Sequence, residues 1–239
     1  MKFKVFHLKR IIATLVVAVV VLAATGIEML VENLMTQSTS ALPLKGKTIV
    51  ADPGHGGIDK GASANGAVEK EINLAVAKFL KEYIESGGGK VYLTRETDTN
   101  TADPNRASGV SQKKSDLQMR KSDIERYKAD IFISIHMNKF EQSKYRGAQV
   151  FYDDDSQENR LLAEAIQQSL KDVLKDGNTR VAKNTGDSIF VLRDNKVPSA
   201  LIECGFLSNT EEANLLKTPE YQKMVAEGIY TGIIKYFSH

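Results

Sequence analysis

Short runs of β-branched and other apolar residues alternate along this chain with longer segments whose apolar residues recur at helical spacing. Such runs predict strands at 47–52, 90–95, 130–136, 148–153 and 199–204, with a weaker one at 189–193. The helical segments are 69–86, 117–127, 157–174 and 220–237. Alternating strands and helices form mainly parallel sheets with right-handed crossovers. We therefore expect a three-layer α/β domain, with a twisted, mostly parallel sheet of about six strands and helices on both faces.

The first part of the chain has a different composition. Residues 11–27 contain no charged residue, and they follow four basic residues: Lys2, Lys4, Lys9 and Arg10. As a helix these residues would extend about 25 Å, close to the roughly 30 Å of a membrane's hydrocarbon core. Basic residues before an apolar segment are typical of exported proteins. We therefore expect an N-terminal hydrophobic helix in 1–27, either a signal-anchor or a signal peptide; a buried core helix is the alternative.

Residues 28–45 form a mixed polar stretch that ends in a Ser/Thr cluster and Pro43. This composition predicts a tether without a core of its own. The remaining residues, 46–239, would then be a single folded domain outside the cytoplasm. We expect contact with the membrane through the N-terminal segment only.

Charge and cysteine content exclude several classes of protein. Four of the 32 basic residues lie within the first ten positions, so the rest of the chain holds more acidic than basic residues. A nucleic-acid-binding domain shows the opposite balance, so no nucleic-acid partner is expected. The single cysteine, Cys204, excludes an intramolecular disulfide and zinc sites built on cysteine pairs, and we interpret it as a small buried hydrophobic residue.

Two histidines follow predicted strands. His55 comes after the first strand in the glycine-rich loop DPGHGG, and His136 ends the strand IFISIH. The carboxyl ends of parallel strands meet at one edge of a sheet, where ligands bind. Glu69 begins the helix after the glycine loop and would face the same edge. Two imidazoles and a carboxylate are a ligand set for zinc with an open fourth position.

Glu203 ends the otherwise apolar strand SALIE, where a carboxylate is costly to bury unless it is paired or functional. At the expected edge it would act as a general base and later return a proton to a leaving nitrogen. Each residue also has a simpler interpretation. The histidines could be turn or core residues, Glu69 a helix N-terminal acid, and Glu203 the partner of a buried Arg193.

Four segments together resemble a known family. ADPGHGGIDKGA, GAVEKEINLAVA, ADIFISIHMN and VPSALIECGFLSN are similar, in this order, to the signature blocks of the zinc-dependent type 3 N-acetylmuramoyl-L-alanine amidases. The resemblance implies that His55, Glu69 and His136 bind Zn²⁺ and that Glu203 is the catalytic glutamate. It also implies a six-stranded α/β fold, with peptidoglycan as the substrate and the amide between N-acetylmuramic acid and L-alanine as the bond cleaved.

The chain also resembles a narrower group, the membrane-anchored, germination-specific amidases of spore-forming bacteria. That resemblance implies action on the spore cortex in preparation for muramic-δ-lactam formation, and location in the forespore or cortex space. Two other classes of function remain open from the residues alone. They are a non-catalytic exported protein that binds peptidoglycan or a partner, and a zinc exopeptidase.

Three other polar residues each have two interpretations. Asn138 could contact substrate or be a polar turn residue, and Asp52 could orient His55 or form an Asx turn. Arg193 could bind a carboxylate of the peptide, or it could form a structural ion pair with Glu203. Residues 97–115 read as a polar surface loop. Because the domain has no wall-binding module, we also expect an activating or localising protein partner.

Overall fold

The computed structural model describes residues 16, 19–29, 42–153 and 156–238, and the chain divides into two units, 1–42 and 43–239. In the first unit, residues 19–29 are helical and exposed. Most of the expected hydrophobic segment and tether lies outside the described residues. Among the residues that are described, no helix has the length and apolar character needed to cross a membrane.

The second unit contains the sheet. Its six strands are β1 (Thr48–Pro53), β4 (Lys90–Leu93), β5 (Ile131–Asn138), β6 (Gln149–Tyr152), β7 (Lys183–Asn184) and β8 (Ser199–Phe206). Their order across the sheet is β4-β1-β5-β8-β6-β7. The first four run parallel, whereas β6 is antiparallel to β8 and β7 is parallel to β6. The mixed, mostly parallel six-stranded sheet expected from the sequence is confirmed.

One strand was predicted at the wrong place. Residues 189–193 do not pair; they form turns that follow the 3-10 turn η1 (Gly186–Ser188). The sixth strand is instead β7, a two-residue polar strand with exposed side chains. Val191 and Leu192 are buried, and together with the partly buried Ile189 they pack over a face of the sheet, which explains why the apolar pattern resembled that of a strand.

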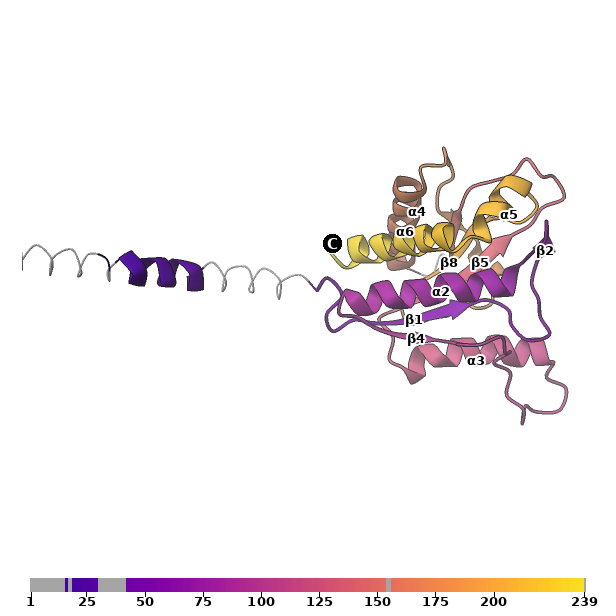
Figure 1. Ribbon diagram of the computed structural model, residues 1–239. Coiled ribbons are helices and arrows are strands. Elements are labelled where there is room, and N and C mark those ends of the chain that lie inside the picture. Colours follow the sequence, from indigo (N-terminus) through magenta and orange to yellow (C-terminus); the bar gives the residue numbers. More distant parts are fainter. Residues whose placement is uncertain (1–15, 17–18, 30–41, 154–155, 239) are drawn as a thin grey trace, which may run out of the picture. The chain divides into compact units, whose positions relative to one another are not determined.

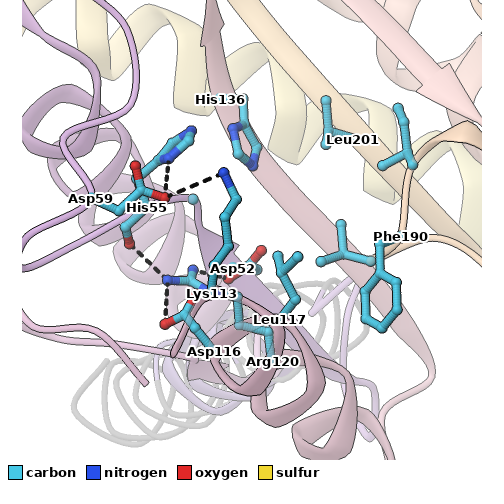
Figure 2. A pocket seen from close by; sticks show the side chains of 13 residues that line it. Asp52, His55, Asp59, Lys113, Asp116, Leu117, Arg120, His136, Phe190 and Leu201 are labelled. Carbon is cyan, nitrogen blue, oxygen red and sulfur yellow. Dashed lines mark hydrogen bonds and ion pairs between the residues drawn. The ribbon is translucent and has the colours of Figure 1, made fainter. Parts of the chain in front are cut away.

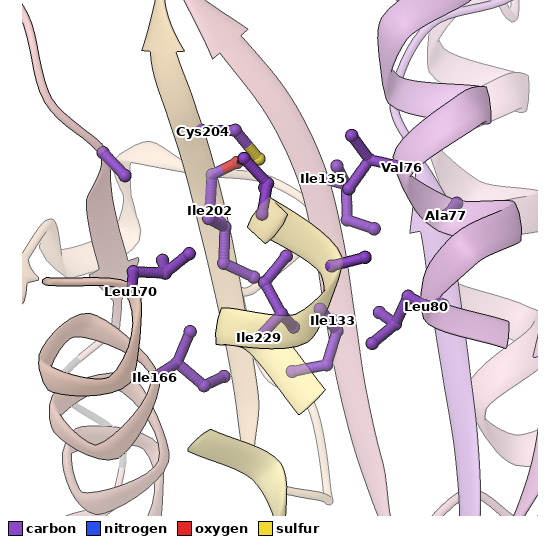
Figure 3. Close-up of a cluster of buried hydrophobic side chains, with 14 of the residues drawn as sticks. Val76, Ala77, Leu80, Ile133, Ile135, Ile166, Leu170, Ile202, Cys204 and Ile229 are labelled. Atoms are coloured by element: carbon purple, nitrogen blue, oxygen red, sulfur yellow. The ribbon is translucent and has the colours of Figure 1, made fainter. Parts of the chain in front are cut away.

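Helices cover both faces of the sheet. On one face lie α2 (Glu69–Ser86), α4 (Gln157–Leu174) and α6 (Pro219–Phe237), and their apolar residues enclose Ile133, Ile202 and Cys204 (Figures 1 and 3). On the other face lie α3 (Gln112–Arg126) and residues 189–197, packed on Val50, Phe132 and Leu201. Successive strand residues point to opposite faces, so His136 and Glu203 belong to the α3 face.

The structure adds short elements that were not predicted. A hairpin, β2 (Ser63–Ala64) and β3 (Ala67–Val68), precedes α2, and α5 (Thr210–Leu216) follows β8. Helix α3 begins at Gln112, earlier than expected, because the Ser111 side chain accepts a hydrogen bond from the Lys114 amide. The polar loop before α3 is therefore shorter than the predicted 97–115.

Candidate active site

His55 lies in the loop after β1, with a backbone φ of +62°. Its Nδ1 atom is 3.0 Å from Asp59 Oδ2, and its Nε2 atom is 3.1 Å from Glu69 Oε1. The contact with Asp59 holds a proton on Nδ1 and leaves the Nε2 lone pair directed at the site. Asp59 was not predicted, although its place four residues after His55 in the same glycine loop was a signal for it.

Glu69 is the first residue of α2 and is buried. Its Oε1 atom is 3.0 Å from His136 Nδ1 and accepts a hydrogen bond from the Met137 amide at 3.1 Å. Its Oε2 atom accepts a hydrogen bond from the Ala62 amide at 2.6 Å. The loop that leads into the β2-β3 hairpin and strand β5 therefore both hold this carboxylate.

His55, Glu69 and His136 form a group that could hold a metal ion, because their ligand atoms lie within 4.8 Å of one another. The two imidazole rings stand edge to face, with centroids 5.0 Å apart. Glycines make room for them: a Cβ on Gly54 would lie 2.2 Å from His136 Cε1, and one on Gly61 would lie 2.4 Å from Glu69 Oε2. Two nitrogens and one carboxylate oxygen fit zinc.

Electrostatic interactions shift the pKa of Glu69 and the pKa of His55 in opposite directions. Burial would raise the pKa of Glu69, but hydrogen bonds and charge from His136 and His55 outweigh it and hold this pKa well below its usual range. Burial would lower the pKa of His55, but Glu69 and then Asp59 outweigh it and raise this pKa. The carboxylate form of Glu69 is therefore favoured, and a carboxylate oxygen is a ligand that a metal cation binds.

Glu203 lies beside this group. It is paired in register with His136 on the neighbouring strand, so both side chains leave the same face of the sheet. Its Oε2 atom is buried and has no hydrogen-bond partner among the described residues. Burial raises the pKa of Glu203 to about 7. A buried carboxyl that exchanges a proton near neutral pH suits a general acid and base.

The remaining predicted residues have other contacts. The Arg193 guanidinium donates to the carbonyl of Asp187, and no ion pair with Glu203 is present among the described residues, so the pairing alternative is wrong. Asn138 is the last residue of β5, and its side chain accepts a hydrogen bond from the Lys139 amide at 2.7 Å; its contact with substrate stays a prediction. Cys204 is fully buried in the core, and burial raises its pKa, so it is no nucleophile.

Asp52 does not contact the His55 ring. It is buried and accepts hydrogen bonds from Arg120 Nη1 at 2.6 Å, Thr94 at 2.6 Å and Ser134 at 2.7 Å. Arg120 in turn donates to the carbonyls of Pro53 and His55, at 2.9 and 2.7 Å. Asp52 therefore holds the His55 loop indirectly, through Arg120 of α3. The sequence alone did not predict this role of Arg120.

A cavity of about 190 Å³ opens beside His55 and His136 (Figure 2). Leu117 of α3, Leu201 of β8 and residues 189–191 form its apolar side. Asp59 and Lys113 line its opposite side, with 3.9 Å between the Asp59 carboxylate and the Lys113 ammonium. The segment predicted as a sixth strand thus builds a wall of the site.

The structure thus has a mixed sheet covered by helices, with two histidines and a glutamate that could hold a metal ion and a buried glutamate beside them. This arrangement fits the class of metal-dependent hydrolases. The chain belongs to the N-acetylmuramoyl-L-alanine amidase family, whose model matches residues 49–235. It is therefore a cell-wall amidase.

Several relatives are close. The chain is 43% identical over 199 residues to the germination-specific N-acetylmuramoyl-L-alanine amidase of Bacillus subtilis, covering 83% of each chain. Among solved structures, it is 47% identical to the CwlD amidase from Clostridioides difficile, determined in complex with the GerS lipoprotein, with a TM-score of 0.76 over 81% of this chain and 99% of that one. The amidase AmiC2 of Nostoc punctiforme is 31% identical, with a TM-score of 0.67 over 82% and 99%.

Proposed function

We propose that this protein hydrolyses the amide between N-acetylmuramic acid and L-alanine in peptidoglycan, with a zinc ion held by His55, Glu69 and His136. The observation that carries the proposal is the convergence of three ligand atoms within 4.8 Å, next to a buried and unpartnered glutamate oxygen. A zinc ion bound there would act as a Lewis acid: it would polarise the carbonyl of the substrate amide and lower the pKa of a water molecule.

The chain's own residues supply the proton transfers and the positioning. Glu203 takes a proton from the attacking water and returns one to the leaving nitrogen of L-alanine. Its pKa of about 7 lets it do both at neutral pH. Asp59 keeps the His55 ring in one tautomer, and Arg120 holds the backbone of the loop that carries it.

The biological setting is proposed from the relatives. The Bacillus subtilis relative is named as germination-specific, which favours action on spore-cortex peptidoglycan before muramic-δ-lactam formation. Such a role requires export across the cytoplasmic membrane, for which the apolar residues 11–27 would serve. The Clostridioides difficile relative was solved with a lipoprotein, and we propose a lipoprotein partner that localises or activates this chain as well.

The test uses the full chain, loaded with zinc, on intact peptidoglycan, with products identified by mass spectrometry. Stem peptides that begin with L-alanine are expected, and EDTA should abolish their release. Glu203→Ala should abolish release while zinc stays bound, and Glu82→Gln, on the exposed side of α2, is the matched control. Release of free amino acids would identify an exopeptidase. Wall binding without cleavage, with zinc and a lipoprotein present, would identify a binding protein.

A further inference from the structure

The row of side chains that contains His136 and Glu203 continues onto the next strand. Glu203 of β8 is paired in antiparallel register with Gln149 of β6. Directly paired residues place their side chains on the same face, with Cβ atoms roughly 5 Å apart. Gln149 therefore lies beside Glu203, on the side away from the metal-ligand group.

Gln149 holds an arginine. Its Oε1 atom accepts a hydrogen bond from Arg180 Nη1 at 3.0 Å, and its Nε2 atom donates to the Val181 carbonyl at 3.1 Å. Arg180 Nε also donates to the Arg146 carbonyl at 3.0 Å, and the guanidinium lies 4.7 Å from the centre of the Phe206 ring. The guanidinium is thus fixed in position, while its Nη2 atom has no hydrogen-bond partner among the described residues.

The surroundings of Arg180 are cationic. A cavity of about 360 Å³ beside it is lined by Lys144, Arg146 and Arg180, and by one carboxylate, Asp176. Arg146 is within 3.5 Å of Glu211, which leaves Lys144 and Arg180 as the cations without a carboxylate partner among the described residues. A guanidinium held in one plane is suited to bind a carboxylate.

The chemistry of the substrate indicates whether its sugar side or its peptide side would lie beside Arg180. The lactyl carboxyl of N-acetylmuramic acid is consumed in the amide, so the free carboxylates of a muramyl peptide are all on the peptide side. Arg180 follows α4 in the chain, and its guanidinium is hydrogen-bonded to Gln149, whose strand lies next to that of Glu203 at the ~5 Å spacing of adjacent strands. An extended peptide advances about 3.3 Å per residue, so a few residues reach from Glu203 past Gln149 to Arg180.

We propose that Arg180, positioned by Gln149, binds a carboxylate of the stem peptide, so that the peptide runs from Glu203 across β6. This inference rests on the proposed amidase function and adds the orientation of the substrate. It makes the enzyme select peptides with a free carboxylate near the cleaved amide.

The test compares N-acetylmuramoyl-L-alanyl-D-glutamate with its diamide, using the full chain loaded with zinc. We expect wild type to prefer the acid roughly tenfold in kcat/KM, mainly through KM, as for one charged hydrogen bond at a partly exposed site. Arg180→Gln should remove this preference, and Arg180→Lys should retain part of it. Arg126→Gln, at the distant end of α3, is the control and should leave the preference intact. Loss of activity by Arg180→Gln on both substrates equally, or no change, would overturn the proposal.

A second experiment measures binding and does not depend on catalytic turnover. In the Glu203→Ala chain, the Kd of the acid, measured by calorimetry, should be roughly tenfold lower than that of the diamide, and adding Arg180→Gln should make the two values equal. If the acid and the diamide have equal Kd values in the Glu203→Ala chain that keeps Arg180, the proposed carboxylate subsite is wrong. A clear difference in Kd, together with no cleavage by wild type, would instead contradict the amidase function and leave the carboxylate subsite standing.

Discussion

At the scale of single residues, Glu203 has the clearest link between environment and chemistry. It ends a strand of the central sheet, and burial raises its pKa to about 7 from an ordinary 4.5, although the charge of His136 acts in the opposite direction. A cationic partner would lower this pKa, and no arginine of the described residues forms an ion pair with Glu203. The carboxyl is therefore close to half protonated at neutral pH, as an acid and base catalyst needs to be.

This pKa predicts a pH dependence of stability in the zinc-free protein. The folded-state pKa exceeds the unfolded one, so the group's contribution is fully present below about pH 4.5 and is lost as the pH rises through about 7. Glu203→Gln stays uncharged. We expect it to be more stable than wild type by about 1–3 kcal/mol at pH 8, and equal to wild type at pH 4.

Urea unfolding in EDTA at the two pH values measures this difference. Glu82→Gln, which removes an exposed carboxylate from α2, should change stability little at either pH. A stabilisation by Glu203→Gln that is the same at pH 4 and pH 8 would contradict the assignment of the raised pKa to Glu203.

At the scale of elements, α3 is attached to the sheet by charge as much as by apolar contact. Arg120 is almost fully buried and forms ion pairs with Asp52 of β1, at 2.6 Å, and with Asp116 of its own helix, at 2.7 Å. Burial would lower the pKa of Arg120, but the two carboxylates outweigh it and raise this pKa. The same side chain holds the loop with His55, so helix docking and site geometry depend on one residue.

We expect Arg120→Met to destabilise the protein by about 3–5 kcal/mol, because it leaves the buried Asp52 without its charged partner. Adding Asp52→Asn should recover part of this loss, since the uncompensated charge is then removed. Denaturant unfolding of the two single variants and the double variant measures the coupling. If the stability loss of the double variant equals the sum of the losses of the two single variants, the ion pair does not hold α3 on the sheet.

At the scale of the whole molecule, residues 43–239 contain both apolar clusters of the sheet. The unit begins just before Leu44, which is fully buried and whose amide donates to the Gly87 carbonyl at 3.0 Å. The chain therefore becomes part of the core before the first strand starts.

We expect a fragment of residues 43–239 to unfold in one cooperative transition, because it holds the complete core. Leu44→Ala in that fragment should cost about 2–3 kcal/mol through the cavity it leaves, whereas Leu161→Ala, at an exposed leucine of α4 within the same fragment, should cost little. Differential scanning calorimetry checks both. Broad, non-cooperative melting of the fragment would show that residues before 43 complete the fold.

The sequence alone determined the layers and the edge at which the site lies. Apolar residues at strand and helix spacing set which segments become which elements, since burial of one face is a local property of the pattern. His55, Glu69, His136 and Glu203 could be placed together because the carboxyl ends of parallel strands share an edge, and the structure does bring them together.

Only the tertiary structure decided the rest. The sixth strand is two polar residues long, too short to carry a periodic signal, while the apolar residues 189–193 cover a face instead of pairing. The contacts of Arg120 with the His55 loop, and of Gln149 with Arg180, join residues far apart in the sequence. Such pairs depend on strand order and register, which follow from how all the elements pack together and not from any local pattern.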